Sequence, residues 1–171
     1  NMKRLLIFFF LPILIKAEIF DISIPENDTA SYTYADFRIW INDSTDTLRG
    51  IYWFMHPNNG DSRDIVTDTA YQNLAQGQNF AVLGAHIFNM HMDTGIGDAV
   101  IAAMDSFAIL SEHQELSFIP FFINGYSWGG QFAYHFTKWK PERIVGFITQ
   151  KGGYHDTCLL YTSDAADERL S

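Results

Sequence analysis

Residues 119–133 read IPFFINGYSWGGQFA and contain the motif that decides the fold. An apolar run typical of a strand enters a Gly125-Tyr126-Ser127-Trp128-Gly129 turn, and a helical pattern follows from Gly130. A serine at so sharp a strand-to-helix corner is held in strained geometry, with its hydroxyl pushed out of the sheet. The pattern therefore predicts that Ser127 is a nucleophile. The alternative is an ordinary glycine-rich turn between a strand and a helix.

The aromatic residue and the double glycine around this serine, Tyr126-Ser127-Trp128-Gly129-Gly130, resemble the α/β-hydrolase family. The resemblance is to its secreted esterase, depolymerase and prolyl-oligopeptidase-like branches. It covers about residues 35–153 and is absent beyond Thr157. It implies an α/β-hydrolase fold, a mainly parallel sheet with helices on both faces, which in this chain ends after about the sixth strand.

Strand and helix patterns alternate along most of the chain, which favours a mainly parallel sheet built by right-handed crossovers. Two strand patterns near the start, residues 34–41 and 48–56, are joined by a short polar turn and are expected to pair antiparallel. The predicted strands are 18–24, 34–41, 48–56, 80–87, 118–126 and 143–149, and the predicted helices are 64–78, 97–113 and 130–138.

Donors for an oxyanion are expected at two places. The backbone amide of Trp128, directly after the serine, is one of them. The resemblance implies a second donor in the loop after residues 48–56, where the chain reads His56-Pro57-Asn58-Asn59. Because proline has no amide hydrogen, we expect the donor to be Asn58, followed by Asn59. The alternative is that these residues only form a turn.

Ligands of a parallel sheet gather at the carboxyl ends of its strands. Residues at or just beyond such ends are therefore expected to line the cleft, and Phe88, Met90, Met92 and Trp128 could add an aromatic groove. The expected cleft residues are His56, Asn59, His86, Tyr126 and His155.

The sequence does not offer a clear acid and base for a catalytic triad. The resemblance implies the order serine, acid, histidine, with the last two at later strand ends. Asp156 is a candidate acid because it follows the sixth predicted strand, whereas His155 as the base would reverse the order. We expect the base to lie beyond Thr157, so the 171-residue chain itself is expected to be inactive.

Neither a metal nor another cofactor is expected. His86, His91 and Asp93 lie close in the sequence, but a zinc site needs three or four ligands in fixed geometry, and the spacing sets no such geometry. These residues are therefore expected to belong to the cleft wall instead. The only cysteine is Cys158. The chain thus offers no cysteine-based metal site.

Both ends are expected to lie outside the domain, which we assign to residues 18–157. Residues 1–17 combine a basic start with a short apolar run, as a signal peptide does, which predicts a secreted or periplasmic protein with no stable membrane anchor after cleavage. The alternatives are a buried helix or an uncleaved anchor. Residues 158–171 resemble a translated sequencing adapter and are expected to be non-native; the alternative is a disordered acidic tail.

The excess of acidic residues limits the classes of partner that the chain is expected to bind. Twenty acidic residues against eleven basic ones give a formal net charge of −9, which argues against a nucleic-acid partner. The resemblance implies hydrolysis of a small-molecule or polymeric carboxylic ester through an acyl-enzyme on Ser127. A prolyl-oligopeptidase-like serine peptidase and a catalytically dead hydrolase-like binding protein are the alternatives. The oligomeric state is left open.

Overall fold

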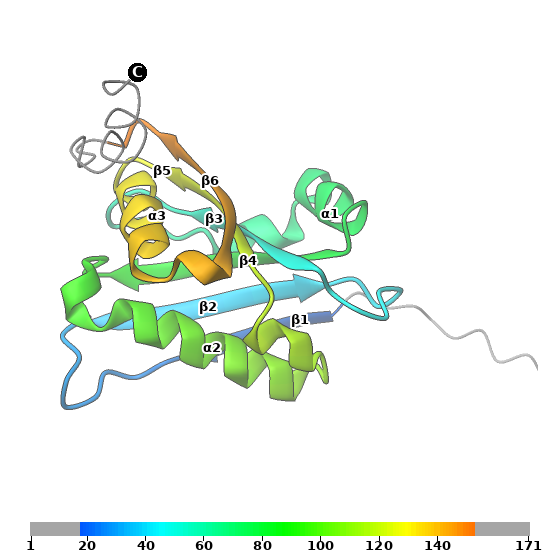
Figure 1. Ribbon diagram of the computed structural model, residues 1–171, viewed down its shortest axis with the longest axis horizontal. Helices are drawn as coiled ribbons and strands as arrows, with labels where there is room; N and C mark the ends of the chain where they lie inside the picture. Colours follow the sequence, from blue (N-terminus) through cyan, green and yellow to red (C-terminus); the bar gives the residue numbers. More distant parts are fainter. Residues whose placement is uncertain (1–17, 153–171) are drawn as a thin grey trace, which may run out of the picture.

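One mixed sheet organises the protein in the computed structural model, which describes residues 18–152 (Figure 1). Its strand order is β1-β2-β4-β3-β5-β6, with β1, β2 and β4 antiparallel and β4, β3, β5 and β6 parallel. This is the α/β-hydrolase fold that the sequence predicts. The strands are β1 (Glu18–Ser23), β2 (Tyr34–Ile41), β3 (Gly50–Met55), β4 (Phe80–Phe88), β5 (Phe121–Tyr126) and β6 (Ile144–Gln150).

The helices lie on both faces of the sheet. Those of the described residues are α1 (Thr69–Gln76), α2 (Ile96–Leu110) and α3 (Trp128–Trp139), with short 3₁₀ turns η1 (Arg63–Thr67), η2 (Met92–Thr94), η3 (Gln114–Ser117) and η4 (Pro141–Arg143). The helix predicted over 64–78 is split into η1 and α1. Asp68 makes the break, because its side chain accepts the amide of Ala70 and caps a new helix.

Two apolar clusters cover the two faces of the sheet. The larger one packs the inner residues of the strands, such as Trp53 and Leu83, against α2 and α3. The smaller one packs Trp40 and Val82 against Ala75 of α1. The central strands β3 and β4 therefore have apolar residues on both sides, as a parallel sheet requires.

The expected antiparallel pairing of residues 34–41 with 48–56 is wrong. β4 lies between these strands, antiparallel to β2 and parallel to β3. The link of residues 42–49 is long enough to pass the amino end of β4, and the Arg49 amide donates to the Asn79 carbonyl just before that strand at 2.8 Å. Insertion of β4 gives its long apolar run a place inside the sheet, where both of its faces are covered.

β6 lies at the edge of the sheet (Figure 1). Its side chains Val145, Phe147 and Ile148 are exposed. An apolar edge strand favours pairing with other chains.

Several predictions concern segments outside residues 18–152. They are the signal peptide over 1–17, the adapter-like tail over 158–171, and the roles of His155 and Asp156. Among residues 18–152, no helix has the length and apolar character that a membrane span requires.

Candidate active site

Ser127 stands at the corner between β5 and α3. Its backbone has φ 54° and ψ −117°, and a positive φ is strained for a residue with a side chain. The serine precedes the first residue of α3, yet its side chain makes no capping hydrogen bond to that helix. The backbone amide of Ser127 donates to the Gln150 carbonyl of β6 at 2.7 Å. This hydrogen bond holds the corner against the neighbouring strand, while the Ser127 hydroxyl makes no hydrogen bond to the helix.

The glycines of the motif let the backbone segments of this corner touch. A Cβ on Gly125 would overlap the Gly129 carbonyl, and a Cβ on Gly129 would overlap the carbonyls of Met55 and His56. Because backbone cannot move aside as a side-chain tip can, these two positions require glycine. The corner is therefore packed directly against the end of β3.

The loop of residues 56–62, which we call the β3 loop, follows this contact. The Gly60 amide donates to the Pro57 carbonyl at 3.0 Å, and Asn59 has φ 55°, so residues 57–60 form a tight turn. Within the described part of the chain, the amides of Asn58 and Asn59 donate no hydrogen bond. Both amides are available to an acceptor outside the turn.

One cavity joins this loop to the elbow. It has a volume of about 300 Å³, and we call it the elbow cavity. The first-turn amide of Trp128 has no partner within its helix, as for every helix start. Trp128 and Asn58, expected to supply the two oxyanion donors, thus share one cavity. Its lining residues are Asn58, Asn59, Phe88, Asn89, Met90, His91 and Trp128.

A second hollow of about 230 Å³ shares Met90, His91 and Trp128 with the elbow cavity. The His91 ring meets the Trp128 ring edge-on, with centroids 5.1 Å apart. This ring pair therefore borders both cavities. His91 was preferred from the sequence as a residue of the cleft wall, and it lines the elbow cavity. Asn89 was not predicted, although a polar residue just after a buried strand was an available signal.

His56, expected to line the cleft, is buried beneath the β3 loop, with 1% of its surface exposed. Its Nδ1 lies 2.6 Å from the Pro57 carbonyl oxygen, and its Nε2 accepts the Ile87 amide at 3.0 Å. Burial lowers the pKa of the imidazole, although the Pro57 carbonyl opposes the shift. The expectation of a cleft residue is corrected, because β4 supplies a buried partner for the ring.

His86 points to the opposite face of the sheet from the buried neighbours Ala85 and Ile87. Its ring stacks on Tyr34 at 4.3 Å, and its Nδ1 lies 3.5 Å from a carboxylate oxygen of Asp36. These contacts explain why His86 lies among polar groups of β2 rather than in the elbow cavity.

Tyr126 directly precedes the serine and is partly exposed. Its ring lies 5.6 Å from the ammonium nitrogen of Lys151, which follows β6. The contact ties the residue before the elbow to the end of the edge strand. Tyr126 does not line the elbow cavity.

The candidate acid Asp156 and the neighbouring His155 lie outside the described residues. Among residues 18–152, no histidine makes a hydrogen bond to Ser127, and no group of three or more histidine, cysteine or acidic side chains could hold a metal ion. The described part of the candidate site thus consists of Ser127, the backbone amides of Trp128 and Asn58, and the elbow cavity.

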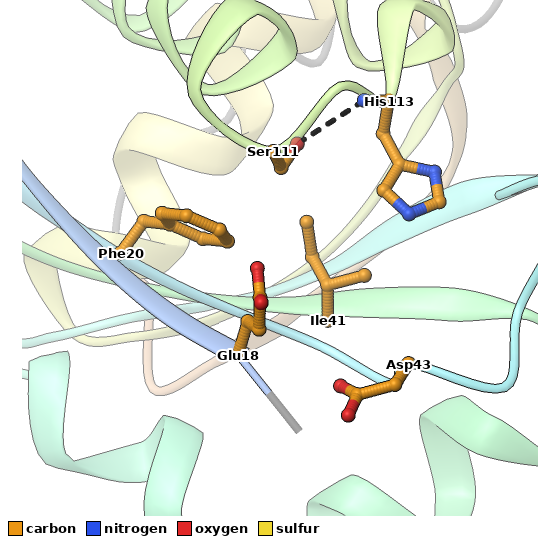
Figure 2. A pocket seen from close by; sticks show the side chains of 6 residues that line it. All are labelled: Glu18, Phe20, Ile41, Asp43, Ser111 and His113. Carbon is orange, nitrogen blue, oxygen red and sulfur yellow. Dashed lines mark hydrogen bonds between the residues drawn. The ribbon is translucent and has the colours of Figure 1, made fainter. Parts of the chain in front are cut away.

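A further hollow lies at the opposite edge of the sheet (Figure 2). Glu18 pairs with Ile41 at the start of β1 and the end of β2, on the side where β4 begins, whereas Ser127 follows the carboxyl end of β5. The volume of this hollow, about 250 Å³, is similar to the volumes of the two cavities beside Trp128. None of the residues around Ser127 lines it. Its lining residues are Glu18, Phe20, Ile41, Asp43, Ser111 and His113.

Comparison with known proteins agrees on the fold. No protein-family model matches the chain, and no curated protein matches it in sequence. Its structure is similar to vibralactone cyclase, with TM-score 0.54, 17% identity, and 92% of this chain and 50% of that chain covered. It is also similar to a bacterial heroin esterase, with TM-score 0.55, 17% identity, and 82% of this chain and 46% of that chain covered. For the fluorophosphonate-binding serine hydrolase F of Staphylococcus aureus, the TM-score is 0.54 and the identity 13%, with 77% of this chain and 55% of that chain covered.

These neighbours show the α/β-hydrolase fold for this chain. The chain spans about half the length of the three solved structures.

Proposed function

We propose that the protein is a serine hydrolase that cleaves carboxylic esters through an acyl-enzyme on Ser127. The observation that carries this proposal is the strained backbone of Ser127, whose hydroxyl caps no helix and which directly precedes Trp128, a residue that lines the elbow cavity. A strained residue is retained where its conformation serves a function. Fold neighbours named as an esterase and a serine hydrolase support the same chemistry.

In the proposed reaction, the Ser127 oxygen attacks the ester carbonyl carbon while a general base takes its proton. The carbonyl oxygen becomes an oxyanion that accepts hydrogen bonds from the amides of Trp128 and Asn58. Collapse of this intermediate breaks the bond to the alcohol oxygen, which leaves with the proton. Water then attacks the acyl-enzyme and releases the carboxylic acid.

The base and the acid of this reaction are assigned outside residues 18–152, with Asp156 as the candidate acid. The elbow cavity is the candidate site of the acyl group, because Asn58 and Trp128, the two residues proposed to supply the oxyanion donors, both line it. In this proposal the protein acts after export, as residues 1–17 predict.

The test is hydrolysis by the full natural chain of a p-nitrophenyl ester and of the p-nitroanilide with the same acyl group. We expect ester hydrolysis that Ser127→Ala lowers by about 10³-fold or more. Ser106→Ala, which changes a serine on the exposed side of α2, should retain full activity. Comparable cleavage of the anilide would favour the peptidase. Absence of both activities would contradict the proposal.

A further inference from the structure

The hydrogen bonds of His56 fix its protonation state. A backbone amide only donates and a backbone carbonyl only accepts, so Nε2, 3.0 Å from the Ile87 nitrogen, carries a lone pair. Nδ1, 2.6 Å from the Pro57 oxygen, carries the hydrogen. His56 is therefore a neutral imidazole with a single tautomer. Both nitrogens are used, and the ring bridges β4 to the β3 loop.

The bond to Pro57 also sets the direction of the next amide. The Pro57 carbonyl and the Asn58 amide belong to one peptide unit, in which the C=O and N–H of a trans bond point in opposite directions. His56 and Gly60 both donate to this carbonyl and hold it toward the buried ring. The Asn58 amide must then point away from the ring. Asn58 lies on the wall of the elbow cavity, which Trp128 also lines.

A second anchor holds the far end of the same loop. The Ser62 hydroxyl accepts the Ala85 amide at 3.0 Å and donates to the Phe54 carbonyl at 2.7 Å. This anchor fixes where the loop ends but does not touch the peptide unit that contains the Asn58 amide. That unit is oriented by the two donors to the Pro57 carbonyl, the His56 ring and the Gly60 amide, and His56 is the only side chain of the two.

We propose that His56 is a positioning residue, which holds the Pro57–Asn58 peptide so that the Asn58 amide faces the substrate oxyanion. The inference rests on the proposed hydrolase function. His56 touches neither the substrate nor Ser127 in this role. It acts on the reaction only through the orientation of one peptide unit.

This role requires the neutral ring. A protonated imidazole has a hydrogen on Nε2, which would face the Ile87 amide hydrogen and break that bond. The His86 ring of β4, 6.4 Å away, opposes protonation of His56, and the Asp61 carboxylate of the loop favours it. Asp61 is paired with Arg63, and His86 faces Asp36 of β2. Since burial is the largest influence and lowers the pKa, the ring is neutral at pH 7.

The first test is a nitrogen-15 NMR spectrum of the histidine rings in the full natural chain at pH 7. We expect His56 to be protonated on Nδ1 only, with the Ile87 amide hydrogen protected from exchange. On acidification, the Ile87 amide should lose protection in step with protonation of His56. A ring protonated on Nε2, or an Ile87 amide that exchanges fast at pH 7, would overturn the inference.

The second test compares His56→Phe, which keeps a ring of similar size but loses both hydrogen bonds, with His56→Gln, which can still donate to Pro57. We expect His56→Phe to lower kcat by about 10²-fold, in the range for loss of one oxyanion donor. KM should change by less than about threefold, because the interaction is made in the transition state. His56→Gln should recover about tenfold of the loss in kcat if the donor is what matters.

The pH profile separates positioning from a structural role. Protonation of the catalytic base alone makes log(kcat/KM) fall with unit slope on the acid side. In the wild type, protonation of His56 should make log(kcat/KM) fall more steeply at lower pH, which gives a second slope. His56→Gln should keep unit slope over the whole acid side. His113→Gln, at the far edge of the sheet, should behave as the wild type does. Variants that only lose stability while keeping the wild-type kcat and the second slope would overturn the inference.

The two proposals fail separately. If Ser127→Ala leaves hydrolysis unchanged, the proposed function is wrong, whatever His56 does. If Ser127→Ala abolishes hydrolysis but both His56 variants retain kcat, the function stands and the positioning role is wrong. If His56→Phe does not fold, His56→Gln and the wild-type NMR spectrum decide the outcome.

Discussion

The α-carbon of Gly129 lies against the backbone carbonyl of His56, with no side chain between them. This contact joins the elbow after β5 to the start of the β3 loop. It sets the separation between the Trp128 amide at the start of α3 and the Asn58 amide in the loop. The distance between the two proposed oxyanion donors is therefore fixed by backbone packing.

Gly129→Ala should disrupt this contact. The added methyl group would overlap the carbonyls of Met55 and His56, so either the helix or the loop must shift. We expect a lower Tm and loss of reactivity at Ser127, measured by thermal unfolding and ester hydrolysis. Gly77→Ala is the matched control. Gly77 has φ −61° and its nearest neighbour to an added Cβ is 3.6 Å away, so the Tm should stay or rise by the equivalent of about 0.4–1 kcal/mol.

Arg143→Met should destabilise the fold. The buried guanidinium donates to the carbonyls of Ile119, Ser117 and Leu116, at 3.0, 2.7 and 3.1 Å. Methionine keeps part of the apolar volume but leaves these acceptors without a partner, which we expect to cost about 1–3 kcal/mol in urea unfolding.

A surface arginine provides the comparison for that measurement. The partly exposed Arg38 pairs with Asp21 at 2.8 Å and with the almost fully exposed Asp64 at 3.3 Å. Exposed ion pairs contribute little, so Arg38→Met should cost less than about 1 kcal/mol. Equal losses for the two variants would contradict the role assigned to Arg143.

Glu115 should make stability depend on pH. Burial raises the pKa of this carboxyl, but hydrogen bonds from the Leu48 amide and from His113 outweigh it, so the folded-state pKa lies below the usual value. A lowered folded-state pKa stabilises the protein above the unfolded-state pKa, and this stabilisation is lost as the pH falls through the folded-state pKa.

The measurement is the free energy of unfolding of the wild type and of Glu115→Gln between pH 7 and pH 3. The wild type should be more stable at neutral pH, and the difference should shrink below about pH 4.3, the ordinary pKa of glutamate. A difference that stays constant over this range would contradict the assignment of Glu115.

The elbow could be predicted because its information is local. Gly125, Ser127 and Gly129 are close in the sequence, and the structure gives Ser127 the strained backbone that their spacing indicates. The order of the strands in the sheet was harder to predict from the sequence. A polar link such as residues 42–49 can close a hairpin or pass another strand, and only the long apolar run of β4 decides between them.

The environment of His56 could not be predicted from its position after β3. Its partner Ile87 is 31 residues away, and the two meet only because β4 lies beside β3. The same pairing removes His56 from the cleft wall. The assignment of Asn58 as a donor stays a prediction; it rests on a local property, the lack of an amide hydrogen on Pro57.

The most direct measurement for the central claim is labelling of the full natural chain with a fluorophosphonate, followed by peptide mapping. We expect one modified residue, Ser127, and no labelling of Ser127→Ala. Labelling of Ser106→Ala should match the wild type. An unlabelled wild-type chain, or labelling that persists in Ser127→Ala, would contradict the assignment of Ser127 as the nucleophile.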